Sequence, residues 1–517
     1  MLKEILCGSF AKHADRPALW IDGRQFNYRE LHELASRFQQ GMSDLPPESP
    51  VGVLTARSLA AYAGILGTVL GGRTYLPLNV DFPLERLAKI ADSADASAIV
   101  LGSNELDLGL ALQATLKAPP TLVVLDEDDL SIDVRSPMET ACVDRRPART
   151  AAGSEQPAYV MFTSGTTGEP KGIAIEQTNL AAYLDGIDHL FDFRPSDRFS
   201  QFFNLSFDLS VHDLFVAWTC GASLHVPTQT ELLDPVAFAR RQELTVWFSV
   251  PSAAALAMRF RRLGPDSLPT LRHGLFCGEA LDRDVAQAFA AAAPNARITN
   301  LYGPTEATIA ITHYRLPHHH AAADAAVVPI GHAFPGQETL VLRNDLSAVD
   351  PGEAGELWLG GSQVTSGYTN NADQTAAKFR RMTQRGKASQ AWYATGDLVE
   401  EHPRFGLIYR GRKDDQIKLH GHRIELTEVE GALREAAGTP LAIVVPWPSE
   451  RPQKLIALVA APHPPAGDIL AAMAATLPPY MVPASIETAT DMAFNANGKL
   501  DRKKTTEHWI KADIEDN

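Results

Sequence analysis

The chain has 517 residues, of which 45% are hydrophobic and 21% are charged, a composition typical of globular proteins. A chain of this length is too long to fold around a single hydrophobic core, so we expect two or more domains. The formal net charge of −15, from 47 basic and 62 acidic side chains, excludes a general electrostatic attraction to nucleic acid or to anionic membranes.

The N-terminal sequence and the cysteine content indicate the cellular compartment in which the protein is found. The first residues are interrupted by charges and lack the apolar core of a secretory signal, and no apolar run approaches the ~18 residues of a membrane-spanning helix. The four cysteines, at positions 7, 142, 220 and 277, form no CxxC pair and predict neither a disulfide framework nor a zinc site. We therefore expect a soluble, cytoplasmic protein without membrane or nucleic-acid partners.

In chain order, helical and strand patterns alternate along the first 300 residues. Residues 27–42 have helical spacing of apolar side chains. Short apolar runs predict buried strands at 49–55, 96–102, 121–126, 244–250, 273–279 and 296–303. This alternation predicts an α/β fold with parallel sheets covered by helices.

The last hundred residues carry a pattern of their own. Residues 411–425 alternate as strands do, and 425–438 predict a helix with Thr427 as its cap, Glu430 three residues later and Gly438 at its end. Further strands are expected at 441–447 and 454–461. We place a domain boundary between a large domain, 1–413, and a small α+β domain, 414–517. The histidines at 318–320 stand in an expected surface loop, with no carboxylate or cysteine pattern that would favour a metal site.

One loop is unusually rich in hydrogen-bond donors: YVMFTSGTTGEPKG, residues 159–172. Glycines let successive backbone N–H groups converge on an anion, hydroxyls add donors, and a lysine adds charge. The alternative is a flexible turn that binds nothing. The pattern is not a Walker loop, because Pro170 stands where that motif needs glycine and Gly172 follows the lysine. A nucleotide-phosphate site of another type is expected from Thr163, Ser164, Gly165, Thr166, Thr167, Gly168 and Lys171.

Several motifs around this loop occur together in a familiar order. They are FNYREL (26–31), VLGGRTYLPLNVDFPLERL (69–87), NLYGPTEATI (300–309), GELWLGGSQVTSGY (355–368), YATGDL (393–398), GRKDDQIKLHGHRIEL (411–426) and NGKLDRK (497–503). With the loop they resemble the adenylate-forming superfamily, which includes acyl-CoA ligases, luciferases and the adenylation domains of nonribosomal peptide synthetases. The amino-acid-activating branch is the most similar. The resemblance implies a large N-terminal domain and a small, mobile C-terminal one.

The reaction implied by the resemblance is attack of a substrate carboxylate on the α-phosphate of ATP, which gives an acyl-adenylate and pyrophosphate. Because the reactants carry like charges, positive potential and fixed geometry are required. The loop would hold the β- and γ-phosphates. In YGPTE, Thr305 would donate to a phosphate oxygen and Glu306 would help to hold Mg2+, for which hard oxygen ligands are suited. Taken alone, YGPTE is typical of a tight turn with a surface glutamate.

The resemblance also implies contacts to the nucleoside. The adenine side would be formed by Gly278, Glu279, Ala280, Asn300, Tyr302 and Gly303. Asp397 would accept both ribose hydroxyls, since a carboxylate is a bidentate acceptor; alone, it is a turn aspartate. Arg412 would lie near the ribose or the α-phosphate.

The small domain is expected to supply the catalytic lysine. Lys499, by default a solvated turn residue after Asn-Gly, matches the family lysine that bridges the substrate carboxylate and the adenylate oxygens. Asp414 stands where the family hinges. Rotation there would remove Lys499 and bring residues 420–425 to the site for a second half-reaction.

The substrate clue is Asp208, a carboxylate within an apolar, aromatic-rich stretch. Alone it would be a satisfied core or capping residue; the resemblance places it on the α-ammonium of an amino acid, and a buried carboxylate needs such a partner. The rest of the expected pocket is uncharged and comprises Leu209, His212, Ser249, Leu275, Cys277, Leu301, Ile309 and Ala310. We expect a small to medium uncharged amino acid: Ser, Thr, Cys, Ala or Pro. His212 and Ser249 either bind a substrate hydroxyl or only pack locally.

The acceptor of the activated acid is expected to be the phosphopantetheine thiol of a separate carrier protein, since no carrier domain follows residues 497–503. A free-standing adenylation enzyme of nonribosomal peptide or antibiotic biosynthesis fits this interpretation. Three alternatives stay open: a ligase that uses coenzyme A or an amine as acceptor, a D-alanine–carrier protein ligase, and a non-catalytic nucleotide-binding or scaffolding protein. Gln177 departs from the family pattern, which often has histidine there.

Overall fold

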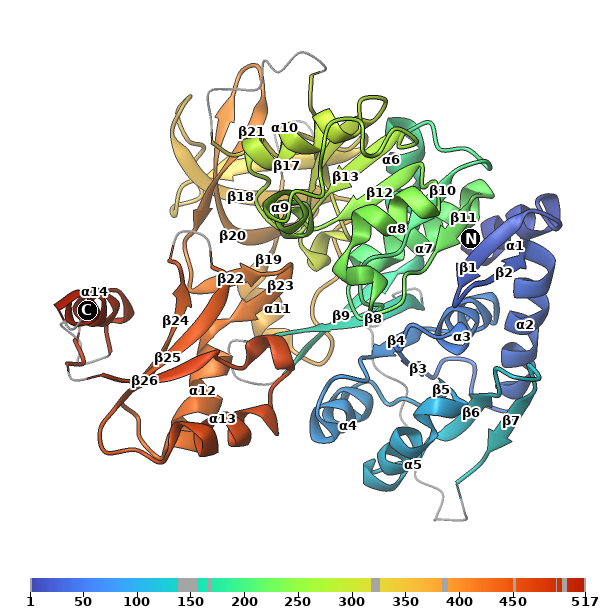
Figure 1. Cartoon of the computed structure of the whole chain (residues 1–517), viewed down its shortest axis with the longest axis horizontal. Helices are drawn as coiled ribbons and strands as arrows, with labels where there is room; N and C mark the ends of the chain where they lie inside the picture. The colour runs from blue at the N-terminus through green and yellow to red at the C-terminus, as the bar shows by residue number, and fades with distance from the viewer. Residues whose placement is uncertain are drawn as a thin grey trace. The chain divides into compact units, whose positions relative to one another are not determined.

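The structure of the protein is a computed structural model (Figure 1). It describes residues 2–137, 156–165, 170–317, 326–383, 389–449, 452–489, 491–494 and 500–515. The chain forms two compact units: unit 1 comprises 1–80, 90–162 and 172–413, and unit 2 comprises 81–89, 163–171 and 414–517. The main division therefore follows Lys413, while the two short segments of unit 2 from the N-terminal part are not apparent from the sequence.

A nine-stranded sheet in unit 1 is built around parallel strands, with antiparallel strands at its edges. Its order is β16-β15-β14-β13-β12-β10-β11-β1-β2. Strands β12 to β14 are almost wholly buried, which explains their continuous apolar sequence. The bounds are β1 Pro17–Ile21, β2 Arg24–Asn27, β10 Arg198–Ser200, β11 Ser223–His225, β12 Val246–Ser249, β13 His273–Phe276, β14 Arg297–Tyr302, β15 Thr312–Arg315 and β16 His332–Ala333.

A seven-stranded sheet has the order β7-β6-β5-β3-β4-β8-β9. Strands β3 to β6 pair in parallel, as predicted, and β7 is an antiparallel edge. The strand bounds are β3 Val51–Leu54, β4 Tyr75–Leu78, β5 Ala98–Gly102, β6 Thr121–Leu125, β7 Ile132–Arg135, β8 Pro157–Thr163 and β9 Lys171–Glu176.

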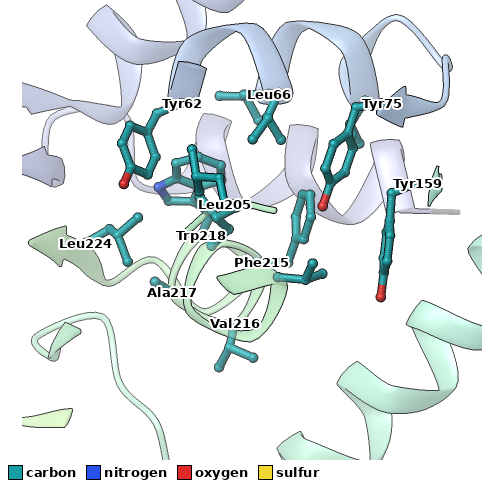
Figure 2. Packing of buried hydrophobic residues seen from close by; sticks show 14 of the residues in the cluster. Tyr62, Leu66, Tyr75, Tyr159, Leu205, Phe215, Val216, Ala217, Trp218 and Leu224 are labelled. Atoms are coloured by element: carbon teal, nitrogen blue, oxygen red, sulfur yellow. The ribbon is translucent and has the colours of Figure 1, made fainter. Parts of the chain in front are cut away.

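Helices cover these sheets, and α3 is buried along its whole length. Figure 2 shows Tyr62 and Leu66 of α3 facing Phe215 and Trp218 of α7 across the core. A Cβ at Gly67 would lie 2.5 Å from Ala35 O, so only glycine permits the close approach of α2 and α3. The helices are α1 Leu2–Lys12, α2 Tyr28–Gly41, α3 Leu59–Leu70, α4 Leu84–Ser93, α5 Leu106–Thr115, α6 Gln177–Leu190, α7 Leu209–Cys220, α8 Pro235–Arg241, α9 Pro251–Arg259, α10 Arg283–Ala292 and α11 Ala372–Lys378, with 3-10 turns η1 Ser103–Glu105, η2 Glu231–Leu233 and η3 Thr305–Ala307.

A third sheet of unit 1 is entirely antiparallel and was not predicted. The motifs GELWLGG and YATGDL lie in its long strands β18 and β20, which pair with each other. Most of its strands follow one another without a long intervening helix, so the α/β alternation that marks parallel sheets is absent. The strands are β17 Gln337–Leu342, β18 Ala354–Gly361, β19 Phe379–Met382, β20 Gln390–His402 and β21 Gly406–Arg412.

Unit 2 contains the predicted α+β arrangement around its own apolar core. The hairpin of β22 Gln416–Leu419 and β23 His422–Glu425 leads into α12 Leu426–Ala437, and a three-stranded sheet follows. The remaining elements are β24 Ala442–Trp447, β25 Lys454–Ala460, α13 Ala466–Ala474, η4 Pro479–Met481, β26 Ser485–Ala489 and α14 Arg502–Glu515.

The predicted start of α12 is wrong in detail. The helix begins directly after β23, so Glu425 occupies the cap position rather than Thr427, and its side chain makes no capping hydrogen bond within this described segment. Glu430 does not close a capping box, because it accepts from the N–H of Val444 and from Arg502. The helix ends as predicted, with Gly438 in the left-handed conformation at φ 65°. Among the described residues, no helix is long and apolar enough to cross a bilayer.

Candidate active site

The residues predicted for the amino-acid site lie mainly where parallel strands of the nine-stranded sheet end. Ser249 of β12 pairs with Phe276 of β13, which pairs with Asn300 of β14. The carboxyl ends of neighbouring parallel strands form a common edge, which is where open α/β sheets bind ligands. Residues immediately after β13, beginning with Cys277, therefore lie at the same edge.

The structure gathers most of the predicted pocket residues in one buried cluster. Apart from Asp208, every predicted pocket residue is at most 3% exposed. The members that share a single apolar cluster are Leu209, Leu275, Cys277, Leu301, Ile309 and Ala310. His212 adjoins this group, since its ring lies 4.7 Å from that of Phe248 in a T-shaped arrangement. Positions far apart in the sequence thus line one apolar region.

Asp208 stands at the start of α7 and is half-buried, so the expectation of a buried carboxylate is met only in part. Its side chain makes no capping hydrogen bond to this described helix, which removes the capping alternative. Burial raises the pKa values of Tyr75, Tyr159 and Tyr183 well above the ordinary range, and the negative charge of Asp208 adds to the rise at each. Figure 2 shows the rings of Tyr75 and Tyr159 side by side. The carboxylate of Asp208 therefore lies close enough to these three buried tyrosines to affect their ionisation.

The two polar pocket residues differ in their remaining hydrogen-bonding capacity. Ser249 Oγ accepts from Trp247 Nε1 at 2.9 Å and donates to Val250 O at 3.0 Å, so its proton is already used. A hydrogen bond of 2.7 Å joins His212 Nδ1 to the Tyr183 hydroxyl, while the buried His212 Nε2 has no hydrogen-bond partner among the described residues. His212 therefore retains a polar atom for a substrate, whereas Ser249 is satisfied locally.

His212 gives a prediction for pH. Burial lowers its pKa from the ordinary 6.5 to about 3. Between these values the unfolded chain binds a proton that the folded protein does not, so stability falls as the pH decreases from about 6.5 toward 3. His212→Gln should flatten the dependence of unfolding free energy on pH between 6 and 4 by up to about 1.4 kcal/mol per unit. Denaturant unfolding at several pH values checks this, and parallel curves for the two proteins would contradict it.

A second group of predicted residues meets at β14 and the antiparallel sheet. Asp397 of β20 pairs across the ladder with Arg412 of β21. Arg412 Nη1 donates to Asp397 Oδ1 at 2.6 Å, and the Tyr302 hydroxyl donates to Asp397 Oδ2 at 2.5 Å. The carboxylate is 5% exposed. Each carboxylate oxygen can accept more than one hydrogen bond, so the group remains able to accept from a pair of neighbouring hydroxyls.

Glu306 lies on the turn η3 and is fully buried rather than a surface glutamate. The Tyr368 hydroxyl donates to its Oε1 at 2.7 Å, and the N–H of Thr365 donates to its main-chain carbonyl at 3.0 Å. Thr305 is half-buried on the same turn. Nearby, a Cβ at Gly303 would lie 2.6 Å from Ala310 Cα, so this position has no room for a side chain.

The predicted adenine-side residues are only partly satisfied by the protein. Asn300 Nδ2 donates to the carbonyls of Val328 at 3.3 Å and Pro329 at 2.9 Å, and its buried Oδ1 has no hydrogen-bond partner in the described part of the chain. Glu279 Oε2 accepts from the N–H of Ser252 in the first turn of α9. The other two residues after β13 are Gly278, half-buried at φ 94°, and Ala280, which is exposed. Asn300 thus offers an unsatisfied buried acceptor at this edge of the sheet.

The described phosphate-loop residues belong to unit 2, where the start of α12 contacts them. The N–H of Gly165 donates to Glu428 Oε2 at 3.1 Å, and Ser164 Oγ accepts from the N–H of Glu425 at 3.2 Å. Lys171 Nζ lies 3.5 Å from Glu425 Oε1. The Gly165 N–H and the Lys171 ammonium, which the sequence assigns to phosphate oxygens, are here directed at carboxylates, the protein's own anions.

Several predicted site residues lie outside the described part of the chain. Lys499, Thr166, Thr167 and Gly168 lie outside the described residues, as do the histidines at 318–320. Thr163 is described, and its buried Oγ1 has no hydrogen-bond partner within the described ranges. Asp414 is the first residue of unit 2 after Lys413, and its Oδ1 accepts from the N–H of Gln416 at 3.4 Å.

The chain is similar in sequence to a known enzyme family. The AMP-binding enzyme family matches residues 8–369, well over half of the chain. The chain belongs to this family.

Similar curated proteins include both long synthetases and single ligases. The chain is 32% identical over 510 residues to the D-alanine--D-alanyl carrier protein ligase of Lacticaseibacillus rhamnosus, covering 95% of this chain and 96% of that protein. It is 32% identical over 502 residues to a linear gramicidin synthase polypeptide of Brevibacillus parabrevis, covering 95% of this chain but only 9% of the synthase polypeptide. The chain therefore corresponds to a small part of the synthetases that it matches.

A solved structure agrees over the whole length. The Vibrio cholerae adenylation domain AlmE, in complex with glycyl-adenosine-5'-phosphate, has a TM-score of 0.86 and 30% identity, covering 99% of this chain and 98% of AlmE. The predicted fold class, a large sheet-rich N-terminal part with a smaller C-terminal one, is confirmed. This member of the AMP-binding family is an adenylate-forming ligase, a class that uses ATP and typically Mg2+.

The predicted site residues of this AMP-binding enzyme are chemically suited to bind ATP and Mg2+. Glu306 and Thr305 offer oxygen ligands on one turn, and Mg2+ bound to a substrate phosphate commonly takes only one or two protein carboxylates. The unsatisfied Asn300 Oδ1 is an acceptor of the kind that an exocyclic amine requires.

Three supporting residues of this ligase were not predicted from the sequence. Tyr368 holds Glu306, Tyr183 holds His212, and Gln363 contacts the segment that follows η3. Tyr368 and Gln363 lie inside the motif at 355–368, so the motif itself was a signal that they matter. For Tyr183, in the middle of α6, the sequence carries no such signal.

Proposed function

We propose that this chain activates a small, uncharged amino acid as aminoacyl-AMP and releases pyrophosphate. The aminoacyl group then passes to the phosphopantetheine thiol of a separate carrier protein, which forms a thioester and releases AMP. The observation that carries the proposal is Asp208, a carboxylate that directly precedes Leu209 of the buried apolar cluster at the start of α7 and does not cap the described helix. A substrate ammonium is a matched counter-charge for such a half-buried carboxylate.

The rest of the pocket limits the side chain of the amino acid. No other charged residue belongs to the predicted lining, and His212 is held neutral by burial, which lowers its pKa to about 3. A charged substrate side chain would lose its hydration without gaining a counter-ion, which is unfavourable. The side chains of Leu275, Leu301 and His212 occupy volume, which favours Ser, Thr, Cys, Ala or Pro over tyrosine and tryptophan.

In this proposal the protein mainly positions ATP and the amino acid and neutralises the negative charge of the phosphates. Asp397 accepts from the ribose hydroxyls, Asn300 Oδ1 accepts from the adenine amine, and the loop 163–171 holds the β- and γ-phosphates. Lys499 donates to the carboxylate and phosphate oxygens as negative charge develops, which lowers the barrier electrostatically. Glu306 and Thr305 would hold Mg2+, which shares the phosphate charge. Asp414 serves as the hinge between the 1–413 and 414–517 domains.

Several relatives support a second candidate for the reaction. Several proteins that match along nearly their whole length are named D-alanine--D-alanyl carrier protein ligase. D-Alanine is small and uncharged, so it fits the same pocket argument. We keep D-alanine activation as the second candidate, ahead of a CoA or amine acceptor.

The deciding experiment is ATP–pyrophosphate exchange with all proteinogenic amino acids and with D-alanine. Exchange that depends on one small, uncharged amino acid supports the proposal, and a higher rate with D-alanine than with L-alanine selects the second candidate. ATP binding without exchange on any amino acid contradicts both and supports a non-catalytic role. Consumption of the adenylate by a holo-carrier protein, compared with coenzyme A, then identifies the acceptor.

The metal role of Glu306 leads to a separate prediction. Tyr368→Phe removes the hydroxyl that donates to Glu306 Oε1. Partners that orient a metal ligand are worth roughly 10–100-fold in metal affinity, so the Mg2+ concentration for half-maximal exchange should rise about tenfold. Calorimetric binding of ATP with and without Mg2+ should show a smaller gain from the metal in the variant. Tyr314→Phe is the matched control, and equal Mg2+ dependence in all three proteins would refute the role.

A further inference from the structure

The segment after Glu306 has an unusual backbone. Thr308 and Ile309 have φ angles of 57° and 70°. Both are β-branched, and such residues are strongly disfavoured in this left-handed region. A conformation of this kind persists only where surrounding contacts hold it, and strained residues of this type cluster at functional sites.

Gln363 makes those contacts. It is fully buried, and the two N–H groups of its Nε2 lie within hydrogen-bonding distance of three main-chain carbonyls. Ala310 O is the nearest acceptor at 2.7 Å, while Ala307 O at 3.3 Å and Thr308 O at 3.4 Å share the other N–H. In return, Thr308 Oγ1 donates to the main-chain carbonyl of Gln363 at 2.6 Å. One side-chain amide thus satisfies carbonyls on both sides of the strained residues.

Gln363 is itself fixed from two other elements. Its N–H donates to Oε1 of Gln337, the first residue of β17, at 3.1 Å. Asn179 of α6 donates through Nδ2 to the carbonyls on either side of Gln363, Ser362 O at 2.8 Å and Val364 O at 3.3 Å. The main chain around Gln363 is therefore held in place by β17 and α6, which fixes the position from which its side-chain amide contacts residues 307–310.

We propose that Gln363 is a positioning residue of the amino-acid site. By holding the carbonyls of Ala307, Thr308 and Ala310, it keeps Ile309 and Ala310 in the orientation that the amino-acid site requires. This inference rests on the proposed function. Its effect falls on the amino acid rather than on the metal, because Glu306 is held independently by Tyr368 and Thr365.

The test compares two buried glutamines. Gln363→Met keeps the volume but removes the donor, and KM for the preferred amino acid should rise about tenfold or more, since several buried carbonyls lose their partner. KM for ATP should change less than about threefold, and discrimination against larger amino acids should weaken. Gln201→Met is the control: Gln201 is also fully buried, but its side chain bonds to Arg57 outside the site. It should lower the melting temperature and leave both KM values unchanged.

A second variant covers the case in which Gln363→Met does not fold. Thr308→Val keeps the shape and removes only the bond to Gln363 O, so a smaller rise in the amino-acid KM is expected. If amino-acid and ATP KM values rise together, or if neither changes in folded variants, the positioning role is refuted. The wild-type protein separates the two proposals, because failure of the proposed function appears as an absence of amino-acid-dependent exchange before any variant is made.

Discussion

Replacement of Asp208 by alanine is expected to abolish amino-acid-dependent pyrophosphate exchange. The substrate ammonium would lose its charged partner inside a poorly solvated pocket, and loss of one partner of such a pair costs roughly 3–5 kcal/mol, or about 200- to 5,000-fold in kcat/KM. Asp208→Asn should lose nearly as much, because the amide keeps the size but not the charge. Exchange kinetics with the preferred amino acid measure both effects.

The position of Asp208 allows its substitution to be interpreted. Asp208 does not cap the described helix α7, so its replacement should leave the helix intact and lower the melting temperature only slightly. Asp188, an exposed carboxylate on α6, provides the control substitution. Asp188→Ala should behave as wild type. Unchanged use of the best amino acid by Asp208→Ala would disprove the ammonium role.

The second large effect is expected for Lys499→Ala. Removal of a group that stabilises transition-state charge typically costs about 10²–10³-fold in rate, so exchange should fall by about that factor while ATP binding is largely kept. Steady-state exchange and equilibrium binding of ATP, measured on the same preparation, separate the two. Transfer from a chemically supplied aminoacyl-AMP to the carrier thiol should survive, because the lysine acts in the first half-reaction.

The control for Lys499 lies in the helix that follows it in the chain. Lys504 is exposed in α14, and Lys504→Ala should leave both half-reactions unchanged. Wild-type exchange by Lys499→Ala would refute the assignment. A loss of ATP binding equal to the loss of exchange would assign the lysine to nucleotide binding instead.

The sequence by itself determined features that are local along the chain. The helix at 27–42, the parallel strands and the end of α12 at Gly438 follow from side-chain periodicity and from turn chemistry, which operate over a few residues. The glycine- and hydroxyl-rich loop and the ordered motifs were sufficient to identify the adenylate-forming family. Asp208 could be singled out because a carboxylate is conspicuous in an apolar stretch.

Tertiary structure alone decided which residues support the site. The sequence treated Asp397 and Arg412 as separate contacts, but pairing of β20 with β21 joins them, and β14 brings Tyr302 to the same carboxylate. Only the fold shows that Glu306 is buried and bonded to Tyr368, and that Asp208 is half-buried. These relations depend on which strands pair and in which register, and that is set by long-range packing.

The same reason explains Gln363. Its position inside a recognised motif predicts nothing about its partners, since the Ala310 carbonyl that it binds most closely lies 53 residues earlier in the chain. The positive φ angles of Thr308 and Ile309 could not be predicted from the sequence either. β-Branched residues rarely adopt a positive φ, so their residue types predict an ordinary backbone here. The chemistry of this protein was readable from local motifs, whereas the geometry that supports it appears only when distant segments pack together.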